Sequence, residues 1–144
     1  INITAADNIQ FGFQANASGG SGFNETVTNT YFRAFHTESD SDASLTQDTN
    51  RDQSQGTGLI EIISDFGSDS DASASGTLHI FEPSNTTFVK HFLAESINYA
   101  RSNSARHMFV AGFINTTSAI DEIQFKFDSG NIESGQISLF GISW

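Results

Sequence analysis

Two acidic runs are the strongest candidates for ion chemistry in this sequence. One reads ESDSDAS and contains Asp40 and Asp42, and the other reads GSDSDAS and contains Asp69 and Asp71. Calcium prefers several hard oxygen ligands, and alternating Asp and Ser residues can supply more than one of them from a single turn. We therefore treat these four carboxylates as candidate calcium ligands, with solvated turn residues as the alternative.

A further acidic segment imitates an EF-hand calcium loop but lacks two of its requirements. Asp48, Asn50 and Asp52 match the first three ligand positions of such a loop. Gln53 stands where the loop needs glycine, and Leu59 stands where it needs a bidentate glutamate. The segment therefore does not predict an EF-hand.

The histidines offer a second route to a metal site. There are four of them: His36, His79, His91 and His107. The His-x-His spacing of metal-binding jelly rolls is absent from the sequence. If His79 and His91 lie on paired strands, they can converge with Glu82 or Glu95 on a metal ion. The alternative is that all four are isolated strand histidines.

The remaining residue types give no catalytic pattern. The chain has no cysteine, so it has no thiolate nucleophile, and no segment matches the G-x-S-x-G turn of serine hydrolases. No signature separates the acids of the predicted strands and loops from surface charges: Glu61, Glu82, Glu95, Asp121 and Glu122. We expect that the chain is not an enzyme and that it needs no cofactor.

The charge balance excludes several kinds of partner. Six Lys and Arg residues stand against 17 Asp and Glu residues, which gives a net charge of −11. Such a surface repels phosphate, so we expect neither nucleic-acid binding nor a polybasic membrane contact. No apolar run approaches the roughly 20 residues that span a bilayer. Since the sequence opens with Ile1, we expect a processed chain or part of a longer polypeptide.

The elements that position these residues are predicted to be strands. The chain has 14 Phe residues and is rich in Ser, Thr, Asn and Gly, a mixture that favours strands joined by turns. Alternating apolar positions predict strands over residues 9–13, 26–37, 59–64, 76–81, 87–96, 106–114, 120–127 and 136–142. Residues 38–58 and 65–75 are predicted to be polar loops. Residues 88–103 also fit a helical spacing, but the surrounding pattern favours a strand.

Together these elements predict one domain over residues 1–144, with a short N-terminal arm at residues 1–6. We expect an all-β fold, an antiparallel jelly-roll-like β-sandwich of about eight strands. The alternation predicts that one set of side chains faces the core: Ile9, Phe11, Phe13, Ile123, Phe125, Phe127, Ile137 and Leu139. Bulky Phe side chains suit the gap of about 10 Å between two facing sheets.

The C-terminal third resembles a known family. The alternating strand at residues 120–127 is followed by SGNIESG at residues 129–135 and QISLFGI at residues 136–142. This ending resembles that of virion structural proteins of tailed bacteriophages, with Phe140 where that family usually has Tyr. Upstream, the stretch from Tyr31 to Arg33 and the GTLHIFEP stretch at residues 76–83 are similar to earlier strands of the family.

The resemblance implies a jelly-roll-like virion component of a phage particle, placed on the capsid surface as a decoration or cement protein or in the tail apparatus. The leading hypothesis is a capsid decoration or cement module that binds between capsid subunits, with the major capsid protein or other virion proteins as partners. A homo-oligomer, a trimer by analogy, would fit that role. Candidate contact regions are the arm at residues 1–6 and the loops at residues 38–58 and 65–75.

The alternative hypothesis is a carbohydrate- or receptor-binding β-sandwich of a phage tail fibre or lectin-like protein. Such a site needs an aromatic platform on which a sugar ring can stack. The two tyrosines, Tyr31 and Tyr99, are the residues to test, since Trp144 is the only tryptophan.

Overall fold

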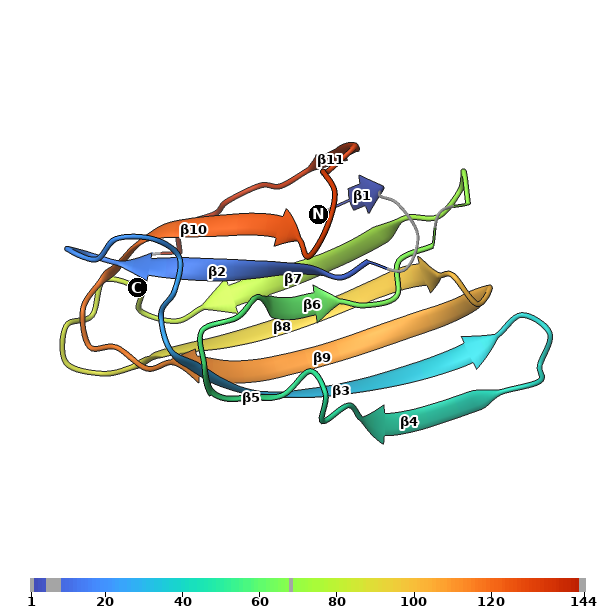
Figure 1. Cartoon of the computed structure of the whole chain (residues 1–144), viewed down its shortest axis with the longest axis horizontal. Coiled ribbons are helices and arrows are strands. Elements are labelled where there is room, and N and C mark those ends of the chain that lie inside the picture. Colours follow the sequence, from blue (N-terminus) through green and yellow to red (C-terminus); the bar gives the residue numbers. More distant parts are fainter. Residues whose placement is uncertain (1, 5–8, 68, 143–144) are drawn as a thin grey trace.

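The computed structural model describes residues 2–4, 9–67 and 69–142, and these residues form two antiparallel sheets packed face to face (Figure 1). Eleven strands and no helix occur in the described part of the chain. The strands are β1 (Asn2–Thr4), β2 (Phe11–Ala17), β3 (Val27–Thr37), β4 (Ala43–Gln47), β5 (Gln53–Gly56), β6 (Ile60–Ile63), β7 (Ala74–Ile80), β8 (Lys90–Ala100), β9 (Ser104–Ile114), β10 (Ile120–Phe127) and β11 (Ser134–Gln136).

The larger sheet has the strand order β11-β1-β7-β8-β9-β3-β4, with β5 pairing a further part of β3, and the smaller sheet has the order β10-β2-β6. Three long strands, β3, β8 and β9, form the middle of the larger sheet. Strands β8 and β9 pair without interruption from Lys90 opposite Ile114 to Ala100 opposite Ser104. This uninterrupted register determines which side chains of β8 and β9 share each face of the sheet.

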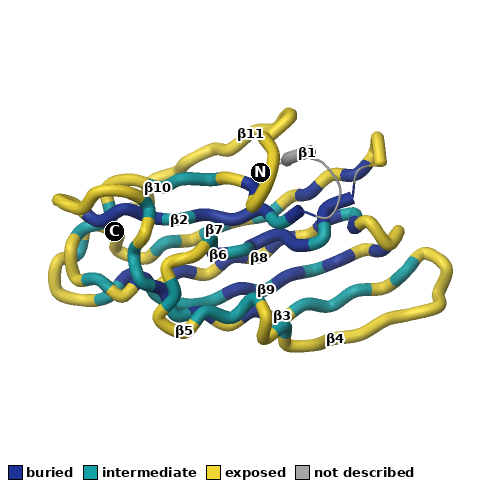
Figure 2. Tube along the Cα trace, viewed as in Figure 1, coloured by how far each residue is buried: buried dark blue, intermediate teal, exposed yellow. Residues whose placement is uncertain are grey.

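The core lies between the two sheets, and phenylalanine and isoleucine are its commonest residues. Phe11 and Phe13 of β2 are fully buried, and the ring of Phe13 meets that of Phe92 edge to face at 5.2 Å. Figure 2 shows buried and more exposed positions alternating along the strands of the larger sheet. The alternation follows from the pleat of a strand, which sends successive side chains to opposite faces. Burial of Ile9, Phe11 and Phe13 confirms the prediction for this segment.

A cluster of ion pairs lies at the border of the core beside β6, one of the two edge strands of the smaller sheet. Three arginines and three carboxylates form this ion cluster: Arg33, Arg51, Arg106, Asp48, Glu61 and Asp65. Asp65 accepts hydrogen bonds from Arg33 at 3.1 Å and from Arg106. Burial alone would raise the pKa of Asp65, but the arginines around it outweigh that effect and lower it. The cluster ties β3 and β9 to the end of β6.

The all-β sandwich predicted from the sequence is confirmed, and so is the choice of strand over helix for β8. The polar stretch at residues 38–58 is not a continuous loop, because β4 and β5 lie within it. Leu45, the one large apolar residue of this stretch, is 73% exposed on β4. Both short strands lack the apolar alternation that reveals a strand, since each lies at the border of the larger sheet with little cover.

The prediction of a final strand over residues 136–142 is wrong for the described structure. The last strand, β11, covers Ser134–Gln136, and pairing ends there. Ile137 and Leu139, predicted to face the core, are 41% and 90% exposed. An alternating pattern forms a strand only where a partner edge receives it, and β1 offers β11 three residues.

Candidate functional site

The larger sheet has one face that the smaller sheet covers and one face that no described residue covers as a second layer. We call the uncovered side the outer face. It consists of the even-numbered residues of β3 and the odd-numbered residues of β7, β8 and β9. Cross-strand pairing aligns these positions in rows. In one row, Phe109 of β9 lies between Phe32 of β3 and Glu95 of β8. Leu45 on β4 extends the face, opposite Ala34.

The outer face carries large apolar side chains in the open. Leu93 is 45% exposed, Ile97 is 55% exposed and Phe32 is 41% exposed. The rings of Phe32 and Phe109 stack with their centroids 5.0 Å apart. Large apolar side chains exposed together on one face often mark an interaction site.

All four histidines lie on the outer face, although they do not converge. His79 is opposite Leu93 and His91 is opposite Phe113. Each histidine lies close to an aromatic ring or a carboxylate: His36 contacts Asp40 at 2.8 Å, His79 stacks on Phe81, His91 lies against Phe113, and His107 contacts Glu95 at 2.7 Å. Among the described residues no three metal-ligating side chains come together. The structure therefore does not assemble His79 and His91 with Glu82 or Glu95 as a ligand group.

The outer face is almost free of fixed charge. Of the outward positions on β3, β7, β8 and β9, Glu95 is the single carboxylate and none is Lys or Arg. Glu95 itself is hydrogen-bonded to His107. In a chain with a net charge of −11, this surface is where another protein can approach without meeting a dense negative field.

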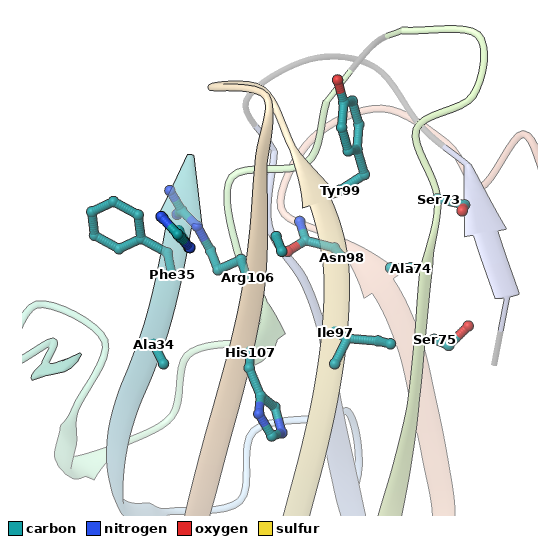
Figure 3. Close-up of a pocket in the computed structure, with 12 residues that line it drawn as sticks. Ala34, Phe35, Ser73, Ala74, Ser75, Ile97, Asn98, Tyr99, Arg106 and His107 are labelled. Carbon is teal, nitrogen blue, oxygen red and sulfur yellow. The ribbon is translucent and has the colours of Figure 1, made fainter. Parts of the chain in front are cut away.

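One end of the outer face is hollowed next to the turn between β8 and β9. The hollow has a volume of about 490 Å³. Figure 3 shows the residues around it, which belong to neighbouring strands. Outward side chains that line it include Ala34, His36, Ser75, Ile97, Tyr99 and His107. Partial desolvation, followed by the charges of Glu38, Asp71 and Asp69, raises the pKa of Tyr99. Tyr99 is therefore a neutral phenol beside acidic loops.

The two acidic runs lie in loops at this same end of the sandwich. Asp40 and Asp42 belong to the connection between β3 and β4, and Asp69 and Asp71 to that between β6 and β7. Asp40 contacts His36, and Asp69 accepts a backbone hydrogen bond from Ala72 through its carbonyl. No group of three or more candidate ligands forms among the described residues. Calcium binding by these loops stays a prediction.

The two tyrosines proposed as sugar platforms differ in their exposure to solvent. Tyr31 is fully buried on the inner face, where its hydroxyl bonds to Ser64 at 2.9 Å and burial raises its pKa to about 12. Tyr31 therefore cannot present its ring to a sugar in this fold. Tyr99 remains accessible at the hollow. Trp144 and residues 1, 5 and 6 of the predicted arm lie outside the described residues, whereas residues 2–4 of the arm form β1.

Sequence reasoning missed the outer face, although a signal for it exists. The strands β8 and β9 carry apolar residues on both sides, with Leu93, Ile97, Phe109 and Phe113 alternating with core residues. Strands that are apolar on both sides are typical of sheets covered on both faces. No described residue supplies such a second cover here.

Comparisons with known proteins return no matching family model, no matching curated protein and no matching solved structure. The described residues also contain no helix that is long and apolar enough to cross a membrane.

Proposed function

We propose that this chain is a structural module of a virus particle, a decoration or cement protein of the capsid that docks on its protein neighbours through the outer face. The observation that carries the proposal is the exposed, nearly uncharged apolar surface formed by β3, β7, β8 and β9. The resemblance of residues 123–142 to virion proteins of tailed bacteriophages supports the setting.

The mechanism would be thermodynamic. Burying what remains exposed of Phe32, Leu93 and Ile97 contributes about 1 kcal/mol for each side chain. A single contact of this size is weak once the cost of association is subtracted. On a symmetric shell, however, oligomeric modules bind at several sites together, and binding only the assembled shell shifts the equilibrium against disassembly.

Electrostatics would set the orientation. The acidic loops that hold Asp40, Asp42, Asp69 and Asp71 border the outer face at its hollow end. A neighbour with an apolar centre and basic residues at its rim would fit this distribution, and an acidic neighbour would be repelled.

The test is incorporation into particles of the virus that carries the gene. The outer-face variant combines Leu93→Asp and Ile97→Asp, and the matched control is Phe88→Asp, at a residue that is 65% exposed but outside the outer face. We expect mass spectrometry of purified particles to find the wild type and the control at lattice-like copy number, with the outer-face variant reduced at least tenfold. Absence of the wild type from particles, or equal incorporation of all three chains, would refute the proposal.

A second candidate function, a carbohydrate- or receptor-binding head, draws on the hollow at Tyr99. A phenol ring beside Ile97 and His107 offers one stacking surface with polar neighbours. Binding on a glycan array that disappears with Tyr99→Ala, and persists with Phe88→Ala, would favour this role over docking.

A further inference from the structure

The short strand β1 lies between β7 and β11 in the larger sheet. The segments on both sides of β1 extend past its amino end. Asn2 is opposite Ser75 on one side and Gln136 on the other. Strand β7 continues to Ile80, and residues 137–142 continue beyond β11 toward the end of the molecule where β7 finishes (Figure 1). No described residue pairs with the free edge of β7 past Ser75.

We call the space between residues 76–80 and residues 137–142 the slot. Each further row advances both sides by one residue, because Ile3 is opposite Ala74 and Gly135 and the Asn2 row follows it. With residues 137–142 extended in the register of β11, the rows across the slot are Gly76 with Ile137, Thr77 with Ser138, Leu78 with Leu139, His79 with Phe140 and Ile80 with Gly141. Where β1 lies between them, β7 and β11 are two strand spacings of about 4.8 Å apart, which is the room that one strand takes.

Both edges of the slot have hydrogen-bonding groups to offer. At the two ends of β7, Tyr99 donates to the carbonyl of Ser73 and Phe81 donates to the carbonyl of His91. Bonded and non-bonded pairs alternate in an antiparallel ladder, so the odd-numbered residues of β7 bond to β8 and the even-numbered ones face the slot. The even-numbered residues are Gly76, Leu78 and Ile80. Residues 137–142 make no backbone hydrogen bond to any residue that the structure describes.

Several side chains around the slot are apolar and incompletely covered. Leu139 is 90% exposed and Phe140 is 82% exposed. Leu78 and Ile80, on the core-facing side of β7, are only partly buried. Across the sandwich, three residues of β10 also pack only partly against the core: Ile120, Ile123 and Phe125. The core is therefore least complete in the region that borders the slot.

We propose that the slot seats one further β-strand that runs in line with β1 and joins it at its amino end. A strand continuous with β1 meets both edges in the register that β1 already has, whereas a separate strand would have to stop head to head against β1. Its residues third and fifth ahead of Asn2 fall in the rows of Leu78 and Ile80, so they face the core and are apolar. The filled slot would also turn Ile137 and Leu139 inward, as their alternation in the sequence predicts.

The test fuses a four-residue extension ahead of Ile1. The in-phase extension reads Val-Thr-Val-Thr and puts valine in the rows of Leu78 and Ile80. The control has the same composition, Thr-Val-Thr-Val, and puts threonine there. We expect the in-phase chain to melt roughly 5 °C higher than the control. We also expect hydrogen exchange at the amides of Gly76, Leu78 and Ile80 to slow at least tenfold, in the in-phase chain alone.

Three outcomes would overturn the proposal. The first is equal melting temperature and equal exchange in the two extended chains. The second is equal protection of the same amides by the free Val-Thr-Val-Thr peptide, which would make the slot a docking site for another chain. The third is protection in the unextended chain that depends on its concentration, with a dimer in solution, which would place a second copy in the slot. None of these results bears on the outer face, which lies on a different side of the sheet.

Discussion

On β8 the residues that face the smaller sheet include Lys90, Ser96 and Asn98, whereas those that face away include Leu93 and Ile97. Three of the six covered residues of the strand are thus polar, whereas three of its five open residues are aliphatic or aromatic. On the covered side each of the three polar residues has a defined partner: Lys90 donates to backbone carbonyls of nearby loops, Ser96 to a carbonyl of β6, and Asn98 to the carbonyl of Ser64.

This contrast separates what holds the fold together from what the fold offers to others. Buried polar groups are stabilising when they are paired and costly when they are not, so the inner face specifies one arrangement of the two sheets. Apolar groups in the open contribute little to the stability of the monomer. Under the proposed function, burial against a partner would account for their presence on the outer face.

The largest effect is expected from the ion cluster on the inner side. Asp65→Ala removes the carboxylate that Arg33 and Arg106 share and leaves two partly buried guanidinium groups without it. We expect the free energy of unfolding to fall by about 3–5 kcal/mol. Urea denaturation measures the change, with Asp121→Ala, at an exposed acid on β10, as a control that stays within about 0.5 kcal/mol. A loss below about 1 kcal/mol would mean that the cluster is not structural.

The pH dependence of Asp65 sharpens the same point. Its pKa is lower in the folded chain than in the unfolded chain, where it is near 3.9. Between the two values the unfolded chain binds more protons, so stability rises with pH there. The contribution is complete above about pH 4 and is lost as pH falls through the folded value. Asp65→Asn should therefore flatten the acid limb of a plot of stability against pH, and an unchanged limb would contradict the assignment.

A smaller loss is expected at Lys90, which is fully buried at the start of β8. Its ammonium donates to the carbonyl of Phe88 at 2.7 Å and to those of Thr116 and Thr117 at 3.4 Å. Lys90→Met keeps the length of the side chain but leaves these carbonyls without their donor, at a cost of about 1–3 kcal/mol. The matched control is Lys126→Met on β10, at an exposed lysine whose replacement should be close to neutral. Equal effects at both positions would show that the buried ammonium is dispensable.

Tyr31 should show a smaller effect still. Tyr31→Phe removes one buried hydrogen bond, to Ser64, and should cost about 1 kcal/mol at neutral pH. Because the folded pKa of Tyr31 is about 12, well above its ordinary value, wild-type stability should fall as pH rises from about 10 through 12. Unfolding at pH 7 and pH 11 should show a shallower fall in Tyr31→Phe than in Tyr99→Phe.

The sequence could predict the strands because their apolar residues alternate, and it could predict which side chains share a face. For β3 it groups Tyr31, Arg33 and Phe35 against Phe32, Ala34 and His36, and the structure keeps that grouping. It could not predict which group is covered. The covered group contains an arginine, and its carboxylate partner lies 32 residues away in sequence. Pairing of that kind depends on the folded arrangement and leaves no local pattern.

The candidate site was harder to predict for a related reason. Acidic runs and histidines are conspicuous in a sequence, but in the structure neither set assembles into a ligand group among the described residues. The outer face is made of ordinary residues such as Leu93 and Phe109, which become distinctive only because nothing described covers them. The exposure of these residues depends on how the whole sheet is covered, so no short sequence motif predicts it.

The smallest effect on stability is expected on the outer face. It tests whether that face stabilises the isolated chain, as the inner face does, or is left open. Leu93→Ser replaces a side chain that is 45% exposed, so the free energy of unfolding should change by no more than about 0.5–1 kcal/mol. The adjacent residue on the same strand, Phe92, faces the core and is 2% exposed, and Phe92→Ala should cost about 3–5 kcal/mol. Thermal and urea unfolding of the two variants compare the faces directly. If Leu93→Ser destabilised the isolated chain as much as Phe92→Ala, the outer face would be covered by the chain itself, and docking on a partner through it would be ruled out.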